Sequence, residues 1–585
     1  MSYVSFDVYG TLIKRILPPK TLYQAMENCR GSQYRNYARN RIDAEKELQR
    51  EGRQNYTLNE IYRAGAFTGL KENVRENMIR YEEECEIRNT VPNEEGQRLC
   101  GIFSKENRLI CISDMYLSSK VIGKILEKNG YAHIERIYVS CEEHKSKRQG
   151  GLFQKVLVDL GISGKELLHI GDAVRSDFLI PRRYGISSKW ITAHGCHPKK
   201  RNDILYHIGF DIFGPVFYEF IVWLHGLAQG KQIYFLSREG EFLKRCYDAV
   251  YGTDEKILYV SRESVIHGSI AVLLETLDMA GLLKLISVQR NETNERLIRR
   301  FGVDVEKYNQ FLLKENLKPE SPLTEATVKF LEDHRKELIL DTRKYEEVFR
   351  AYLQQNMDME KGRILLADIG WKGSMQMLLT KYLREKHQDV QLEGAYLGSV
   401  DDRGKQGFLF CQKNERCADV LSFSGLLESL AMPFHGSVQG YERQDGRIKP
   451  VFRPSEHTVS SKNMIMQVQN GILDLCSEMQ FWKGTSVFDR ETVIEKMVSY
   501  GRFPKRKNIF LEEGLWFYEN GRKYPLVDVP GWRDVLNPKC IWDKFMECSW
   551  KAGWMCKTFK LPLPWYRLLR ILRKKADSRQ AENSF

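Results

Sequence analysis

Short apolar runs alternate with segments of helical periodicity over the first 200 residues. The apolar runs are rich in residues that favour strands, and they read SYVSFD, RLICIS, RIYVS, ELLHIGD and SKWIT. Strands that alternate with helices in this way predict a parallel sheet with helices on its faces. The stretch from about residue 18 to 98, between the first two predicted strands, is almost wholly helical and polar. We interpret it as a helical cap inserted into the sheet domain.

A second α/β region extends from about residue 201 to 455. Its predicted strands are QIYFLS, KILYVS, RILLAD, GAYLGS and GFLFC, and a hairpin is expected around Asp445 and Gly446. Residues 456–585 are rich in Trp and Lys and are expected to be mainly helical. A length of 585 residues is too great for one hydrophobic core. The pattern therefore predicts an α/β protein with a domain at 1–200, a second α/β Rossmann-like domain at 201–455 and a helical region at 456–585.

Composition and charge narrow the functional classes. The 42% of hydrophobic residues and 29% of charged residues are typical of soluble proteins, and no run of 18 apolar residues predicts a membrane span. The thirteen cysteines contain no CxxC pair, which favours a reducing cytosol, and no signal-peptide pattern is expected at the N-terminus. The AHGCH segment at 193–197 is interpreted as a polar loop. The net charge of +13 favours anionic partners, and no nucleic-acid-binding motif is found.

The C-terminal segment combines aromatic, leucine and basic residues. After Trp565, three leucines of RLLRILRKK fall on one helical face, and the basic side chains favour the other. This pattern predicts peripheral contact with an anionic membrane. The alternative is a terminal helix whose apolar face docks on the protein core.

Polar residues with chemical potential follow the predicted strands of the first region. Asp7 ends the first strand in FDVYGTL, where Gly10 and Thr11 turn the chain and leave backbone N–H groups near the carboxylate. In parallel sheets ligands bind beyond the carboxyl ends of the strands, and a carboxylate there can act as a nucleophile.

Three further groups lie in comparable places. Ser113 and Asp114 end the second strand and can supply a hydroxyl and N–H groups to an anion. Lys147 offers a cation for a transferred group. Asp172 and Asp177 follow ELLHI, and paired carboxylates there suit Mg²⁺. Each of these motifs is weak evidence alone. Chance does not account well for their occurrence together, in this order and at the ends of predicted strands.

These motifs resemble the four motifs of the haloacid dehalogenase (HAD) superfamily. The resemblance implies a Rossmann-like core with a helical cap and Mg²⁺-dependent phosphoryl transfer to a small phosphorylated substrate. Asp7 then corresponds to the nucleophile, Ser113 to the phosphate-binding hydroxyl and Lys147 to the stabilising lysine. Asp7, Asp172, Asp177 and the carbonyl of Tyr9 correspond to the metal ligands. Lys145 competes for the lysine role, and Phe153, six residues after Lys147, favours Lys147.

Tyr9 departs from the phosphatase pattern, which has an acidic residue there as general acid. Loss of such a group costs about 10²–10⁴ in rate. DVYGTL resembles the dehalogenase subgroup, which acts without metal, whereas the retained Asp172 and Asp177 favour a metal and phosphate chemistry. Three hypotheses follow: a phosphohydrolase, a non-catalytic phosphosugar-binding or scaffold protein, and a dehalogenase.

The second region contains two strand–turn–helix segments, IYFLSREGEFL and ILLADIGWKGSMQMLL. Arg238, Asp368, Lys372 and Ser374 form a predicted second anion site, since helix N-termini present N–H groups. Ordinary turns are the alternative, and the two segments also echo CISDM and LLHIGDAVRS as an internal copy would.

SREG, ADIGWKGS and SGLLESLAMPFHGSVQGY resemble large HAD hydrolases of bacterial surface-polysaccharide gene clusters. That resemblance implies a cytoplasmic role beside glycan-assembly enzymes.

Overall fold

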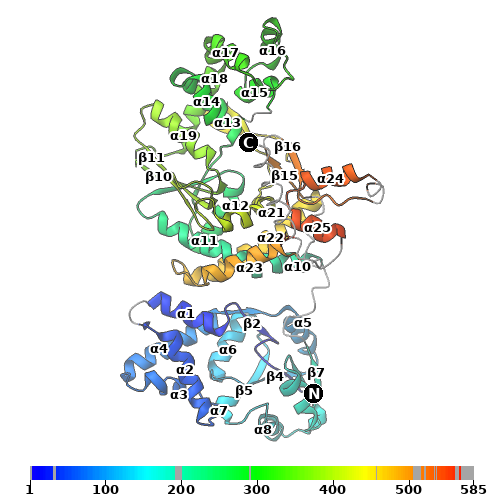
Figure 1. The fold of residues 1–585 in the computed structure, drawn as a ribbon. Coiled ribbons are helices and arrows are strands. Elements are labelled where there is room, and N and C mark those ends of the chain that lie inside the picture. The colour runs from blue at the N-terminus through cyan, green and yellow to red at the C-terminus, as the bar shows by residue number, and fades with distance from the viewer. Residues whose placement is uncertain are drawn as a thin grey trace. The chain divides into compact units, whose positions relative to one another are not determined.

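The computed structural model divides the chain into two compact units (Figure 1). One comprises Met1–Asp203 with Thr485–Phe488, and the other Ile204–Gly484 with Asp489–Phe585. The described residues are 3–30, 34–191, 201–288, 292–360, 362–455, 457–504, 515–519, 522–531, 534, 537–559 and 566–567. The AHGCH segment and nearly all of the predicted C-terminal helix lie outside them.

The first unit is built on a five-stranded parallel sheet. Its strands lie in the order β5-β4-β1-β6-β7, and every neighbouring pair is parallel. Their bounds are β1 Tyr3–Phe6, β4 Arg108–Ser113, β5 Ile134–Val139, β6 Leu167–Gly171 and β7 Ser187–Trp190. All five are predicted strands, so this part of the predicted fold is confirmed. The flanking elements are α5 Glu94–Phe103, α6 Ser119–Lys128, α7 Ser140–Glu143, α8 Gly151–Leu160, η3 Gly164–Glu166, η4 Val174–Leu179 and α9 Ile180–Arg182.

Between β1 and β4 the chain forms the helical cap. Its elements are α1 Pro19–Arg30, α2 Tyr37–Arg50, α3 Leu58–Ile61, η2 Gly65–Phe67 and α4 Glu72–Arg88. A short antiparallel ribbon that the sequence did not predict, β2 Ile13–Arg15 and β3 Thr90–Pro92, pairs the two ends of this insertion. Inside the cap, Arg41 and Glu82 form a fully buried ion pair of 2.8 Å. Arg41 donates to both carboxylate oxygens of Glu82, and Tyr37 and Tyr62 donate further hydrogen bonds to one of them, as a buried charge requires.

The second unit contains another five-stranded parallel sheet, in the order β12-β11-β10-β8-β9. The strands are β8 Gln232–Leu236, β9 Lys256–Leu258, β10 Arg363–Trp371, β11 Gln391–Ser399 and β12 Lys405–Gly407. In chain order this arrangement is 2-1-3-4-5, a doubly wound order, whereas the first sheet is 3-2-1-4-5. The second unit is therefore not an internal copy of the first. β4 and β6 of the first sheet flank β1, but β8 and β10, which carry the echoing segments, are direct neighbours.

The predicted strand GFLFC overlaps the regular strand β12 only at Gly407, where β12 ends. Beyond that residue, the N–H groups of Phe408 and Leu409 still donate to the carbonyls of Tyr396 and Leu397 in β11. The side chains of Phe408, Leu409 and Phe410 are buried, and Phe410 stacks on Trp371 with ring centroids 5.9 Å apart. The apolar run is therefore buried in the core and keeps backbone hydrogen bonds to β11, although the regular strand ends at its first residue. Periodicity alone does not separate burial from regular strand pairing.

Helices cover the second sheet and fill the connection between β9 and β10, drawn in green in Figure 1. Their bounds are α10 Arg201–Ile208, η5 Gly209–Phe213, α11 Gly214–Leu227, α12 Glu239–Tyr251, α13 Arg262–Thr276, α14 Met279–Leu285, α15 Asn294–Phe301, α16 Val305–Lys314, α17 Glu325–Asp333, α18 Arg335–Asn356, α19 Ser374–Glu385, α20 Glu415–Leu421, α21 Ser424–Ala431, α22 Val459–Glu478, η6 Met479–Trp482, α23 Arg490–Arg502, α24 Pro538–Glu547 and α25 Lys551–Phe559. Two antiparallel ribbons complete the unit, β13 Val438–Gln444 with β14 Arg447–Phe452 and β15 Trp516–Glu519 with β16 Arg522–Pro525.

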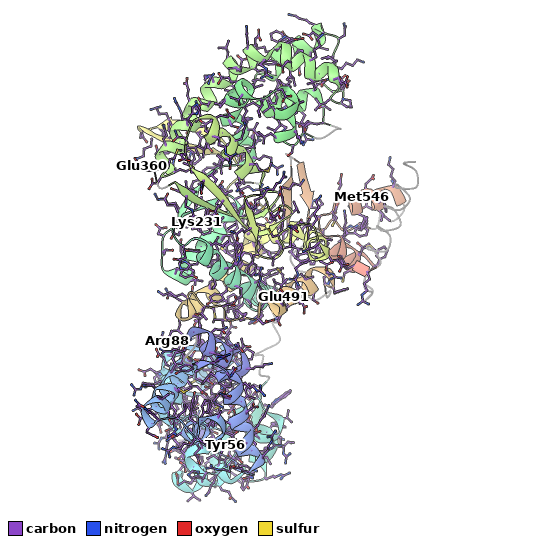
Figure 2. The ribbon with its side chains drawn as sticks, turned by 60° about the vertical axis from the view of Figure 1, so that its left-hand side comes forward. Tyr56, Arg88, Lys231, Glu360, Glu491 and Met546 are labelled. Carbon is purple, nitrogen blue, oxygen red and sulfur yellow. The ribbon has the colours of Figure 1, made fainter. Side chains whose placement is uncertain are left out.

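The predicted hairpin at Asp445–Gly446 is confirmed. Both residues have positive φ, 51° and 75°, as a two-residue hairpin turn of type I′ requires. Figure 2 shows the side chains of both units, with Tyr56 and Arg88 of the cap and Lys231 and Glu360 of the second unit labelled.

One continuous helical run, Ile204–Leu227, is long and apolar enough by composition to cross a membrane, with a mean hydropathy of 1.2. No run of 18 apolar residues was expected, and this helix passes by its mean hydropathy although polar residues interrupt it. In the structure, 67% of its most apolar 18-residue window is buried inside the protein, as is usual for a core helix.

Candidate active site

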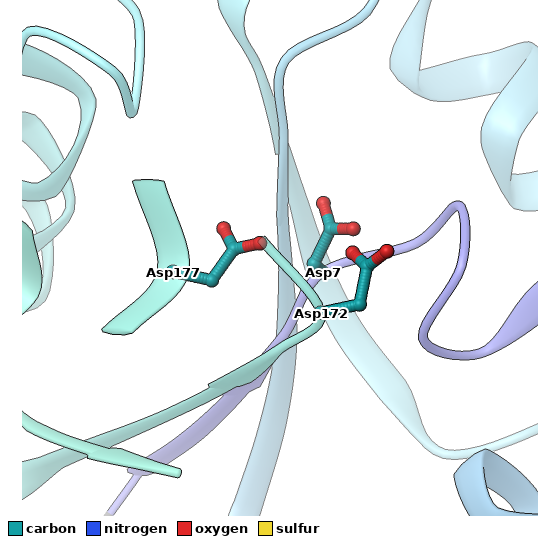
Figure 3. A group of neighbouring side chains, drawn as sticks. All are labelled: Asp7, Asp172 and Asp177. Carbon is teal, nitrogen blue, oxygen red and sulfur yellow. The ribbon is translucent and has the colours of Figure 1, made fainter. Parts of the chain in front are cut away.

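Three aspartates meet at the carboxyl edge of the first sheet. Asp7 follows β1, Asp172 follows the neighbouring strand β6, and Asp177 lies in η4. Figure 3 shows the three carboxylates beside one another, and one oxygen of each lies within 4.8 Å of the others. They lie at the point where the strand order reverses at β1, which is where open parallel sheets bind ligands.

Two glycines make room for this cluster. Gly10 has a φ of +84°, and a Cβ there would overlap the carboxylate of Asp172. A Cβ on Gly171 would overlap the side chain of Asp177. The glycine before Asp172 and the turn after Asp7 are thus required by the close approach of the carboxylates.

Lys147 joins the aspartates. Its side chain is only 4% exposed, and its Nζ donates to Oδ1 of Asp7 and, at 2.7 Å, to Oδ1 of Asp177. Lys145, the other lysine that the sequence offered, is exposed to solvent. Of the two lysines, the structure therefore brings Lys147 to the aspartate cluster.

Asp114, a predicted phosphate-binding residue, uses its side chain to hold a neighbouring loop, and its role toward an anion stays a prediction. Its oxygens accept hydrogen bonds from the backbone N–H groups of Lys147, at 2.8 Å, and Arg148, at 3.3 Å. The carboxylate thereby fixes the loop that presents Lys147. Ser113, the last residue of β4, is buried beside it.

Burial and crowding control the charges of the cluster. Burial raises the pKa of Asp7 to about 7; the Lys147 ammonium opposes this shift and the Asp177 carboxylate adds to it. Burial also raises the pKa of Asp172. Burial acts in the same direction on Asp177, but Lys147 and His169 outweigh it and hold the pKa of Asp177 below its usual range. Three carboxylates thus share one ammonium.

His169 is a neighbour of the cluster that the sequence interpretation missed. Its Nε2 lies 3.3 Å from Oδ1 of Asp177, and its Nδ1 lies 2.8 Å from Oγ of Ser5. Burial lowers the pKa of His169, which keeps the ring neutral. The signal was a polar residue inside the apolar run ELLHI.

Tyr9 and Thr11 lie in the turn after β1. The guanidinium of Arg15 stacks 4.1 Å from the centroid of the Tyr9 ring, and burial raises the pKa of the Tyr9 phenol well above its usual value. Thr11 is fully buried, and its hydroxyl has no hydrogen-bond partner within the described part of the chain.

In the second unit, Asp368 lies in β10, and Arg238 follows the neighbouring strand β8 as the residue before α12. The sheet reverses its order between these two strands. Asp368 is buried, and burial together with Glu239 raises its pKa well above the usual value; Arg238 acts in the opposite direction. Ser374 begins α19, and Lys372 extends into solvent. The acidic neighbours Glu239 and Glu428, which the sequence interpretation missed, make this edge less favourable for an anion. The predicted second anion site stays a prediction.

Comparisons with known proteins give structural likenesses only. No family model and no curated protein matches the sequence. Among solved structures, a 2-haloacid dehalogenase from Pseudomonas syringae pv. Tomato is 15% identical, with 32% of this chain and 86% of that chain covered and a TM-score of 0.26. A HAD family enzyme from Bacteroides thetaiotaomicron is 18% identical over 34% and 97% of the two chains, with a TM-score of 0.25. The HAD-hydrolase YfnB from Bacillus subtilis, bound to magnesium, is 16% identical over 32% and 88%, with a TM-score of 0.25. Because these sequence identities and TM-scores are low, the role of the site is argued from the geometry of its own residues.

Proposed function

We propose that the first unit is a HAD-type, Mg²⁺-dependent phosphohydrolase that acts on a small phosphorylated metabolite through an aspartyl-phosphate at Asp7. The observation that supports this most is the cluster of Asp7, Asp172 and Asp177, with oxygens within 4.8 Å of one another, beside the buried Lys147.

The donor set fits a divalent cation. Three carboxylates and one ammonium leave two negative charges when all are ionised, and Mg²⁺ prefers carboxylate oxygens. Lys147 contacts Asp7 and Asp177, so the oxygens of Asp172 and the second oxygen of Asp7 remain for the ion. By the resemblance, the carbonyl of Tyr9 joins them. A bound ion supplies neutralisation of charge on the phosphoryl oxygens and on the carboxylates.

The residues of the chain carry the reaction. The ionised Asp7 carboxylate forms a bond to phosphorus as the bond to the leaving oxygen breaks, and water then hydrolyses the aspartyl-phosphate. Lys147 stabilises the charge on the transferred group, and Ser113 donates its hydroxyl to it. Asp177 and Asp114 hold Lys147 in place. Burial raises the pKa of the Tyr9 phenol well above its usual value, which makes it a poor general acid, so the leaving oxygen takes a proton from water.

A phosphate-ester panel tests this function with and without Mg²⁺. We expect wild-type turnover of at least one phosphate ester that requires Mg²⁺, and a loss of about 10³-fold or more in Asp7→Asn. Turnover unaffected by Asp7→Asn would reject the assignment. Release of halide from a 2-haloacid without metal would favour a dehalogenase, and phosphosugar binding without any turnover would favour a scaffold.

We extend the proposal to the cellular setting only through the resemblance. It favours a sugar or polyol phosphate in surface glycan biosynthesis as substrate, a cytoplasmic location and glycan-assembly enzymes as partners.

A further inference from the structure

A cleft of about 1070 Å³ lies in the first unit between the cap and the sheet domain. Residues of α1 and α2 and the loop after α2, including Tyr56, form one side. Residues next to the catalytic groups form the other, namely Asp114, Ser146, Arg148 and Arg175. Ligand pockets usually measure roughly 300–1,000 Å³, so the cleft admits a metabolite much larger than a phosphate group.

Basic side chains dominate the lining, with six of them against two acidic ones. Three of the six already have a carboxylate partner. These pairs are Arg15 with Glu86, Arg53 with Glu60 and Lys46 with Asp43. The acidic lining residues are also engaged: Glu45 accepts from Tyr56 and Arg41, and Asp114 accepts from the backbone of the Lys147 loop.

Lys20, Arg148 and Arg175 are different. None of the three has an ion pair or a side-chain hydrogen bond among the residues that the structure describes, although all three line the cleft. Their charges are therefore available to a ligand.

Helix α1 adds to this positive field. Its first turn, with Pro19 and Lys20, lines the cleft and contains no acidic residue. The N-terminus of a 12-residue helix carries a partial positive charge and unpaired N–H groups, which attract anions.

We propose that this cleft binds a second anionic group of the substrate, so that the substrate carries two separate anions, as a sugar bisphosphate or a phosphorylated sugar acid does. The inference rests on the proposed function and specifies its substrate class. One anion is the transferred phosphoryl group, which Lys147 already serves. The second anion binds to Lys20 of the cap, together with Arg148 and Arg175, which the transferred phosphoryl group does not need.

Binding to Asp7→Asn protein tests the proposal without requiring turnover. We would titrate it in the presence of Mg²⁺, by calorimetry, with glucose 6-phosphate against glucose 1,6-bisphosphate, and fructose 6-phosphate against fructose 1,6-bisphosphate. In at least one pair the bisphosphate should bind about 10- to 100-fold more tightly, the range that one hydrogen bond to a charged group supplies.

Variants of the cleft locate the effect. In the Asp7→Asn background, Lys20→Ala and Arg148→Ala should each lower the preference for the bisphosphate about 10-fold and leave monophosphate affinity nearly unchanged. Lys20→Arg, which keeps the positive charge, should retain the preference for the bisphosphate that Lys20→Ala loses. Lys105→Ala removes an exposed lysine outside the cleft lining and controls for net charge.

Equal affinity for both members of every pair, absence of bisphosphate binding at millimolar concentration, or a preference that all cleft variants retain would each overturn the inference. A bisphosphate preference in a protein that hydrolyses no phosphate ester would instead contradict the proposed function alone. Hydrolysis without the preference would contradict only the second anion site.

Discussion

Asp114 illustrates how an exposed residue can govern a buried one. Its carboxylate accepts hydrogen bonds from the N–H groups of Lys147 and Arg148, and Lys147 in turn contacts two of the three aspartates. A displacement of the loop would move the ammonium away from the transferred group, and catalysis is sensitive to shifts of about 1 Å.

Asp114→Ala should therefore lower kcat about 10-fold while Mg²⁺ affinity stays unchanged, because none of the proposed metal ligands is removed. Asp114→Asn keeps one oxygen acceptor and should lose less. Steady-state kinetics and Mg²⁺ titration of both variants measure this. Wild-type kcat in Asp114→Ala would show that the loop needs no such support.

Tyr9 is the second decisive residue. Burial raises the pKa of its phenol well above the usual value, which makes it a weak proton donor, and Arg15 stacks on its ring. An aspartate at this position would supply an acidic group that this chain lacks there.

Tyr9→Asp should raise phosphatase kcat by about 10²-fold, the lower end of what a general acid supplies. The gain should be greatest for substrates with poor leaving groups, and Tyr9→Asn, which has no acid, should show none. A folded, Mg²⁺-binding Tyr9→Asp protein without any gain would mean that another group serves as acid or that the site is not catalytic.

At the scale of elements, the turn after β1 and the end of β6 must approach closely for Asp7 and Asp172 to share a metal. Gly10 allows this twice, by its positive φ and by leaving space for the Asp172 carboxylate. Gly161, which caps α8, has a similar φ of +65° but open space around its Cβ position. A comparison of substitutions at Gly10 and Gly161 therefore separates the effect of backbone strain, which both share, from that of steric overlap, which only Gly10 has.

Gly10→Ala and Gly161→Ala should each cost about 1 kcal/mol of stability or more through the left-handed backbone. Only Gly10→Ala should also weaken Mg²⁺ binding and turnover, by about 10-fold or more, because its methyl group displaces Asp172. Urea denaturation and Mg²⁺ titration compare the two. Unimpaired Mg²⁺ binding in Gly10→Ala would exclude Asp172 from the metal site.

At the scale of the whole molecule, the chain contains two parallel sheets of different strand order, and each has charged residues where its order reverses. In the C-terminal segment that begins at Lys560, the structure describes only Tyr566 and Arg567, which are helical. Tyr566 is buried, and its hydroxyl donates to Asp419, which agrees with the docked alternative for the beginning of this segment.

The basic and leucine faces of RLLRILRKK still predict reversible attachment to anionic membrane, at about 1 kcal/mol for each basic side chain near the surface. Full-length protein should sediment with acidic liposomes at low salt, and protein truncated at Lys560 should not. Neutral liposomes and high salt serve as controls. Equal sedimentation of the two proteins would contradict membrane contact through this segment.

The sequence by itself determined the local features of this protein. Five strands of the first sheet, the helical insertion and the hairpin at Asp445–Gly446 follow from periodicity and turn chemistry, which depend on neighbours in the chain. The positions of Asp7 and Asp172 followed as well, because residues just after parallel strands must gather at one edge.

Only the tertiary structure decided what depends on distant partners. It selected Lys147 over Lys145, since only Lys147 reaches the aspartates, and it made Asp114 a support for the lysine loop. It also separated the two strand orders, because strand pairing is a long-range choice that similar local segments do not encode. Phe408–Phe410 depart from regular strand geometry for the same reason: an apolar run specifies burial, and the partner that buries it decides its conformation.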